Sequence, residues 1–159
     1  MTSNGQTNGD SQFQIPLLIN GKEIHTTTTF TVTSPVTSKP IWKASSVSKK
    51  EAIQAVETAY AAFTSWSKTK PSARRTILLK AADILEKRQE ECIDYMKQET
   101  GALDPFCGFN IVTSVEMLRD TAGRINAVMS GSMPTCGEEG KNSMVFREPY
   151  GVILGIAPW

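Results

Sequence analysis

The residues whose types could do chemistry are few, and three cysteines and a single histidine come first. Cys107 lies near a predicted helix start, where the helix dipole can activate a thiol, but a small buried hydrophobic side chain is the favoured interpretation. Cys92 falls on an apolar helix face, and Cys136 stands in a loop beside two glutamates whose charges disfavour a thiolate. His25 ends a predicted hairpin strand and is expected at the surface. These residues do not combine a nucleophile, a base and an oxyanion site, so residue types alone predict no catalytic centre and no metal site.

The composition limits the kinds of molecule that the protein is expected to bind. Of 159 residues, 17 are basic and 16 are acidic, which gives a formal net charge of +1. This balance gives no electrostatic reason to expect nucleic acid or an anionic membrane as a partner. No apolar run approaches the roughly 20 residues of a membrane helix, and the odd, widely spaced cysteines fit neither a disulfide framework nor a zinc spacing. We therefore expect a cytoplasmic protein.

The first part of the chain has the pattern of short strands. Residues 1–14 are polar and are expected to form a disordered tail. "IPLLINGKEIH" (15–25) places apolar residues on both sides of Asn20-Gly21, a pair typical of a type I′ hairpin turn. "TTTTFTVTSP" (26–35) and "KPIWKAS" (39–45) then read as two more strands because β-branched and aromatic residues are enriched in them.

Three helices are predicted next. Ser48 and Glu51 have the spacing of a capping box, which predicts a helix over 49–66. A second helix is predicted over 72–99, with Gly101 as its C-terminal cap. Asp104 and Pro105 predict the start of a third, as N-cap and first-turn proline, and Gly131 is expected to close it. "SMVFREPYG" (143–151) and "GVILGIAPW" (151–159) are predicted to be strands, the second ending in a turn.

Seven stretches, taken together, resemble the N-terminal third of an NAD(P)-dependent aldehyde dehydrogenase. They are "LLINGKEI", "FTVTSPVT", "AIQAVETAYAAFTSW", "ARRTILLKAADILEKR", "QETGA", "LRDTAGRI" and "REPYGVILGIAPW", and they follow the family's order and spacing from about residue 15 to 159. One departure is "TSP", where many members have Asn before the proline. "CGFNIVTSVEMLRDTAGRI" and "SMVFREPYGVILGIAPW" are similar to the salicylaldehyde and vanillin dehydrogenase-like branch, which acts on aromatic aldehydes.

The resemblance implies an α/β fold, namely the N-terminal part of the aldehyde dehydrogenase fold. Its parts would be N-terminal strands, three long helices, an oligomerisation-type strand and the first strand of the nucleotide-binding sheet. Residues 15–159 would form an incomplete N-terminal, cofactor-binding part of the domain. The cofactor implied is NAD or NADP, the substrate is a small-molecule aldehyde, and the complete enzyme is expected to be a homo-oligomer.

The resemblance also assigns expected site residues. Ile156, Ala157, Pro158 and Trp159 match the segment whose backbone lines the nicotinamide-ribose end of the cofactor. Thr113 and Met117 match helix positions that face the substrate entrance. In the family a cysteine thiolate adds to the aldehyde, a hydride passes to NAD(P)+, and a water activated by Glu hydrolyses the thioester.

None of the three cysteines matches the family's nucleophile, and no catalytic residue is assigned in this chain. We therefore expect a truncated enzyme that is inactive by itself. The alternative is a non-catalytic interaction module that docks on full-length homologues through the edge of the 143–149 strand.

Overall fold

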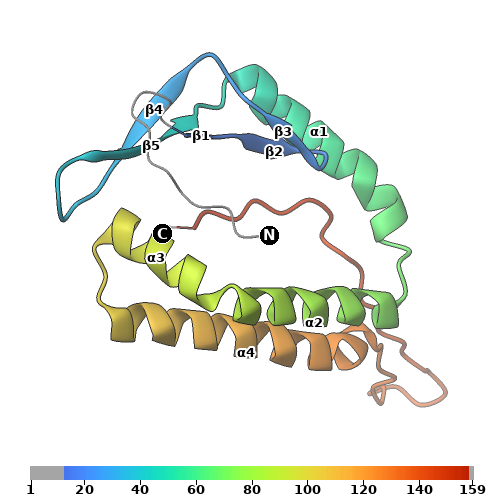
Figure 1. Ribbon diagram of the computed structural model, residues 1–159. Helices are drawn as coiled ribbons and strands as arrows, with labels where there is room; N and C mark the ends of the chain where they lie inside the picture. Colours follow the sequence, from blue (N-terminus) through green and yellow to red (C-terminus); the bar gives the residue numbers. More distant parts are fainter. Residues whose placement is uncertain (1–12, 158–159) are drawn as a thin grey trace.

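The computed structural model describes residues 13–157, and Pro158 and Trp159 of the expected cofactor segment lie outside the described residues. Two layers are visible in Figure 1. One holds the short strands and α1 (Lys49–Trp66), and the other holds α2 (Pro71–Lys87), α3 (Gln89–Thr100) and α4 (Asp104–Met129). The mixed α/β class is confirmed. Within the described residues, no helix is both long and apolar enough to cross a membrane.

A three-stranded sheet forms in the order β1-β5-β4. β1 (Gln14–Ile15) pairs in parallel with β5 (Pro40–Ser45), and β4 (Thr29–Thr33) pairs antiparallel with β5. Gln14, the last residue of the expected tail, therefore already belongs to a strand. The amide side chain of Gln14 also donates to Ser45 Oγ at 3.0 Å, which ties the start of the described chain to the end of β5.

A separate hairpin joins β2 (Leu17–Ile19) to β3 (Lys22–Ile24). Asn20 and Gly21 have φ angles of 55° and 68°. A type I′ turn needs positive φ at both central residues, and this pair adopts it at little cost. The predicted hairpin turn is confirmed.

α1 begins with the predicted capping box. Lys50 N donates to Ser48 Oγ at 3.2 Å, and Ser48 N donates to Glu51 Oε2 at 2.9 Å. These reciprocal bonds satisfy backbone donors that a helix N-terminus otherwise leaves without partners.

The second predicted helix is wrong in one respect, because it is two helices. The chain leaves helical geometry at Arg88, where φ is −100° and ψ is 19°, and Arg88 N shares its hydrogen bond between the carbonyls of Ile84 and Leu85. The bend tilts α3 away from the axis of α2 (Figure 1). Ile93 and Met96 of α3 can then pack against the core that α2 and α4 share.

The start and end of α4 also differ from expectation. Leu103, with extended φ and ψ of −81° and 153°, is the N-cap, and Asp104 is the first helical residue. The Asp104 carboxylate pairs with Lys97 Nζ at 2.6 Å and is not engaged in capping. The helix ends at Met129, before Gly131, and Gly101 caps α3 in the left-handed conformation as predicted.

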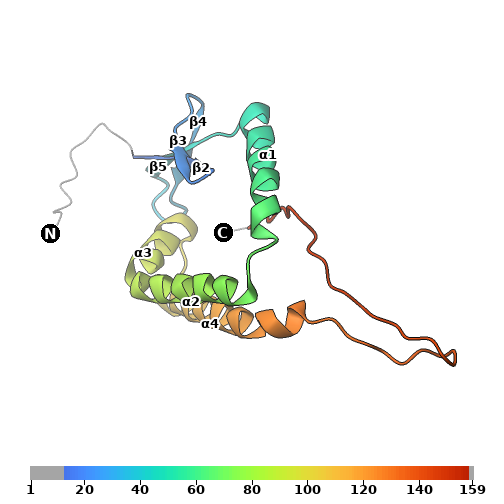
Figure 2. The same ribbon diagram turned by 90° about the vertical axis from the view of Figure 1, so that its right-hand side faces the viewer.

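The core lies between α2 and α4, which run antiparallel side by side (Figures 1 and 2). Ala82 of α2 is fully buried against Ile111 and Val115 of α4. The small side chain of Ala82 leaves room for Ile111 and Val115 between the two helices. Cys107 and Ala122, also on α4, are buried as well.

The two strands predicted at 143–151 and 151–159 are wrong for the residues that the structure describes. Residues 132–145 form a loose hairpin with two isolated bridges, Ser132 to Val145 and Thr135 to Asn142, and residues 146–157 have no strand pairing. A strand is stabilised by hydrogen bonds to a neighbouring strand, and residues 146–157 run without such a neighbour. The hairpin extends away from the helices (Figure 2).

Candidate functional site

Thr113 and Met117 lie on α4 four residues apart, so they share one face of the helix. Thr113 is half-buried, and Met117 is 64% exposed. Ile111 and Val115 point instead into the α2 contact. The expected substrate-entrance pair therefore lies outside the buried contact between α2 and α4.

Phe109 extends this row by one turn toward the N-terminus of α4. Its side chain is 65% exposed, and the spacing of four residues places it in line with Thr113 and Met117. Phe109 was not among the expected site residues, and its i, i+4, i+8 spacing with Thr113 and Met117 makes it a further candidate. An aromatic ring, a hydroxyl and a thioether in one row suit an aromatic ligand, because rings pack edge to face and sulfur contacts ring edges favourably.

The expected cofactor residues lie in the chain that follows the hairpin. Ile156 is 86% exposed and Ala157 is exposed. Gly151, at the start of this segment, has a φ of +100°, a conformation that residues with a side chain rarely adopt. The described part of the segment is thus an open stretch of backbone and does not enclose a dinucleotide.

The two groups of expected site residues do not meet. Residues 151–157 run between the strand layer and α2, whereas α4 lies on the other side of α2 (Figures 1 and 2). The helix that carries Thr113 and Met117 therefore lies on the far side of α2 from the segment that contains Ile156 (Figure 1). In this structure α4 and the C-terminal segment offer two surfaces, not one cleft.

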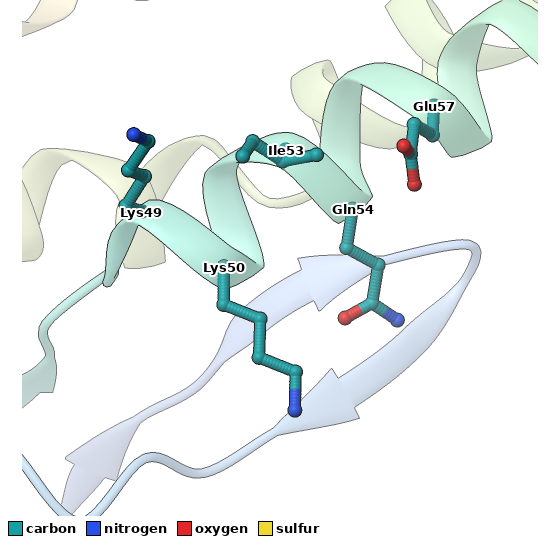
Figure 3. Close-up of a pocket in the computed structure, with 5 residues that line it drawn as sticks. All are labelled: Lys49, Lys50, Ile53, Gln54 and Glu57. Atoms are coloured by element: carbon teal, nitrogen blue, oxygen red, sulfur yellow. The ribbon is translucent and has the colours of Figure 1, made fainter.

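Two cavities in the described part of the chain are lined by residues other than the expected site residues. One of about 610 Å³ is lined by Lys49, Lys50, Ile53, Gln54 and Glu57. All five belong to α1, and Figure 3 shows Lys50 and Gln54 pointing toward the β2–β3 hairpin while Lys49 points away. A surface from a single helix cannot surround a substrate. A second cavity, of about 470 Å³, lies where the C-terminal end of α4 meets residues 147–150.

The three thiols lack the surroundings of a nucleophile. Cys107 is fully buried, Cys92 packs against the α2–α4 core, and Cys136 is half-buried in the 132–145 hairpin. Their favoured interpretation as structural residues agrees with this placement for Cys107 and Cys92. His25 is exposed, as expected. Across residues 13–157, no group of three or more His, Cys, Asp and Glu side chains could hold a metal ion.

Comparison with known proteins gives the context for these surfaces. The model of the aldehyde dehydrogenase family matches residues 23–159. The vanillin dehydrogenase of Pseudomonas sp. (strain HR199 / DSM 7063) is 39% identical over 149 residues, which is 92% of this chain and 31% of that protein. The salicylaldehyde dehydrogenase of Pseudomonas sp. (strain C18) is 35% identical over 131 residues, 82% of this chain and 27% of the relative.

Comparison with solved structures gives the same kind of enzyme as comparison of the sequences. The crystal structure of a salicylaldehyde dehydrogenase from Pseudomonas putida G7, complexed with salicylaldehyde, superposes with a TM-score of 0.79 and 30% identity. The match covers 86% of this chain and 28% of that enzyme. The chain therefore spans less than a third of the length of the relatives that it matches. Both the sequence and the fold match these enzymes, and the chain belongs to the aldehyde dehydrogenase family.

Proposed function

We propose that this chain is the N-terminal part of an NAD(P)-dependent aldehyde dehydrogenase that oxidises an aromatic, salicylaldehyde-like aldehyde to the carboxylic acid. The observation that carries the proposal is the likeness to the Pseudomonas putida G7 enzyme, whose crystal structure contains salicylaldehyde. The vanillin dehydrogenase relative, named for another aromatic aldehyde, supports the same substrate class. Within this proposal the enzyme is a cytoplasmic homo-oligomer, and residues 15–159 supply part of its cofactor-binding domain.

Thr113 and Met117 are proposed to line the approach of the substrate, together with Phe109. Met117 contributes a polarisable thioether, and Phe109 contributes a ring that can pack against the ring of an aromatic aldehyde. Both side chains are exposed, so neither is needed to hold α4 against α2. Their role can therefore be tested without disturbing the core.

Ile156, Ala157, Pro158 and Trp159 are proposed to face the cofactor through their backbone. In the 159-residue chain Ile156 and Ala157 are exposed, and the described residues include no thiol placed for attack on an aldehyde. Attack requires an accessible thiolate with an activating neighbour. We expect the chain by itself to show no aldehyde oxidation with NAD+ or NADP+.

A chimeric enzyme tests this proposal. Residues 15–159 would replace the matching part of the Pseudomonas sp. HR199 vanillin dehydrogenase, and NADH formation would be followed with salicylaldehyde and with acetaldehyde. We expect an active chimera, because the replaced part has the same fold and 39% identity. A folded chimera that binds no cofactor would contradict the placement of residues 156–159.

Met117→Ala in that chimera tests the substrate role. Because the other part of the enzyme supplies the rest of the pocket, the informative quantity is the ratio of kcat/KM for the two aldehydes. We expect the variant to lower kcat/KM for salicylaldehyde by about 2- to 10-fold, the worth of one sulfur–aromatic contact, and to leave acetaldehyde nearly unchanged. Ser114→Ala, at an exposed neighbouring position, is the matched control. Equal losses for both aldehydes would remove Met117 from the substrate entrance.

The second candidate function is a non-catalytic interaction module. The 132–145 hairpin and its continuation expose Met133 by 74% and Phe146 by 76%, and the hairpin has no further strand beside it among the described residues. Unpaired edges of this kind are templates for strand addition. Co-elution of the chain with full-length vanillin dehydrogenase, abolished by Phe146→Lys, would favour this candidate. Separate elution would exclude it for that partner.

A further inference from the structure

A pocket of about 480 Å³ lies between the strand layer and α3, and the proposed function does not use it. Its lining comprises Phe13, Ile15, Trp42, Tyr95 and Glu99. Phe13 and Ile15 come from the β1 region, Trp42 from β5, and the last two from one face of α3. The volume falls within the roughly 300–1,000 Å³ of small-molecule sites.

Two aromatic rings form adjoining walls. The ring centroids of Trp42 and Tyr95 are 5.8 Å apart, and the planes meet at 78°. Trp42 is half-buried, so its ring is held by its surroundings while part of it remains accessible. The face of an aromatic ring carries the negative side of its quadrupole and attracts cations.

The hydrogen-bond donors of these walls are already used. Trp42 Nε1 donates to Glu99 Oε1 at 2.9 Å, and the Tyr95 hydroxyl donates to Glu91 Oε1 at 3.1 Å. Phe13 and Ile15 have no polar side-chain atoms. The lining side chains therefore leave no donor for an anion or for a ligand that needs a hydrogen bond to a carbonyl.

The pocket also carries an uncompensated negative charge. Glu91 is neutralised by Arg88, whose Nη2 lies 2.7 Å from the Glu91 carboxylate. Glu99 accepts only the neutral indole N–H, and among residues 13–157 no Lys or Arg forms an ion pair with it. Lys97, the basic residue closest to it on α3, pairs with Asp104.

We propose that this pocket binds a small alkylated ammonium cation, with its charge against the faces of Trp42 and Tyr95 and beside the Glu99 carboxylate. A trialkylammonium group needs no hydrogen-bond acceptor, so it matches a lining of ring faces and one carboxylate. A primary ammonium would lose more hydration than this open pocket replaces. A neutral group of the same shape would gain only dispersion contacts.

The test uses choline and its neutral isostere 3,3-dimethyl-1-butanol, titrated into the 15N-labelled 159-residue chain. The indole N–H signal of Trp42, assigned by its loss in Trp42→Phe, reports on the pocket directly, and the other indoles serve as internal references. We expect a saturable shift of the Trp42 signal with choline, and binding of the isostere that is about 10-fold weaker, as befits a cation–π site.

The Glu99→Gln variant removes the negative charge but keeps the shape of the side chain. Its amide oxygen can still accept the hydrogen bond from Trp42 Nε1. We expect this variant to bind choline about 3- to 10-fold more weakly, since one partly exposed carboxylate is lost, and to bind the isostere as before. Glu90→Gln, on the same helix but outside the lining, is the matched control and should leave both affinities unchanged.

Two results would overturn the proposal. Equal binding of choline and its isostere would make the pocket a plain apolar groove. A Trp42 signal that does not move with choline, or that sits at the position of a disordered indole, would mean that the cation site does not exist in the protein.

Discussion

Arg119 of α4 reaches across to α2, where its Nη2 donates to Glu86 Oε2 at 2.6 Å. The same nitrogen lies 3.5 Å from Asp83 Oδ1, one turn earlier on α2. These contacts span the helix pair beside the core formed by Ala82, Ile111 and Val115. An ion pair between two helices constrains their register, whereas a pair within one helix does not.

We predict that Arg119→Met lowers the melting temperature at low ionic strength and that the difference shrinks in about 1 M salt, where the Debye length is ~3 Å. The partners are more than half exposed, so the effect should be small. Arg124→Met is the control, because the ion pair of Arg124 is with Asp120 on its own helix. Thermal unfolding of both variants at low and high salt measures the difference. An Arg119 effect that is no larger than the Arg124 effect would mean that the pair across the helices contributes nothing.

Ile111 is the largest of the three buried side chains in the contact between α2 and α4, at 5% exposure. Ile111→Ala should lower the free energy of unfolding by about 2–5 kcal/mol, through lost burial and the cavity left behind. A typical total is only about 5–15 kcal/mol, so the variant could unfold at room temperature. Val112→Ala removes methyl groups from the adjacent, 54% exposed position and should cost far less. Urea unfolding followed by circular dichroism compares the two, and similar midpoints would contradict the placement of the core.

Gly101 has a φ of +71°, and a Cβ there would lie 2.9 Å from Val36 Cγ2. Gly101→Ala should destabilise the protein by about 1–2 kcal/mol from the left-handed backbone alone, with the contact to Val36 adding to it. Gly108→Ala offers the opposite case. Gly108 lies within α4, and a Cβ at this position would point into open space, with no neighbouring element within 4 Å. Gly108→Ala should therefore stabilise the protein by about 0.5–1 kcal/mol. Melting temperatures of the two variants that move in the same direction would contradict the prediction.

The Glu91 carboxylate gives a pH dependence with a defined sign. Hydrogen bonds from Arg88 and then from Tyr95 lower the pKa of Glu91 from 4.5 to about 2. Because the folded pKa is below the unfolded value, this stabilisation is complete above about pH 4.5 and is lost as the pH falls toward 2. Glu91→Gln should therefore flatten the dependence of stability on pH in that window, and Glu90→Gln should not. Thermal unfolding at a series of acidic pH values measures it, and parallel curves for the two variants would contradict the expectation.

The features that the sequence predicted correctly depend on residues close together in the chain. The Asn20-Gly21 turn, the Ser48–Glu51 capping box and the Gly101 cap each need only a few neighbouring residues, and each is present in the structure. The bend at Arg88 has no such signal. Neither glycine nor proline marks it, and the bend allows Ile93 and Met96 of α3 to pack against the core that α2 and α4 share.

The remaining differences between the predicted and the observed structure depend on contacts between residues that are far apart in the chain. An alternating apolar pattern over residues 151–157 is typical of a buried strand, but strand pairing requires a neighbouring strand, and the described residues supply none. For the site, only the family resemblance assigned Thr113 and Met117 to the substrate entrance, and their spacing of four residues puts them on one face of α4. That α2 lies between α4 and the C-terminal segment depends on how the helices pack in space, which no local pattern contains (Figure 1).

The exposed apolar face of α1 leads to a last prediction, on self-association. Ile53, Val56 and Tyr60 lie along one face of α1 and are 47%, 60% and 68% exposed. Burying a single Val or Ile side chain gains about 1.5–3 kcal/mol, so association that covers such a face is favourable. We therefore expect the purified chain to associate through this face into folded oligomers at micromolar concentrations.

Light scattering after size-exclusion chromatography, over a range of concentrations, measures this association. Tyr60→Lys should shift the chain toward the monomer, because the charge would be buried in any contact made by this face. Ala62→Lys adds the same charge on the opposite side of α1 and should leave association unchanged. A monomeric wild-type chain with a sharp two-state melt above about 55 °C, high in the mesophilic range, would show that the exposed face does not drive association. An equal effect of both lysines would instead assign the association to net charge, since repulsion between like-charged chains does not depend on which face of α1 carries the lysine.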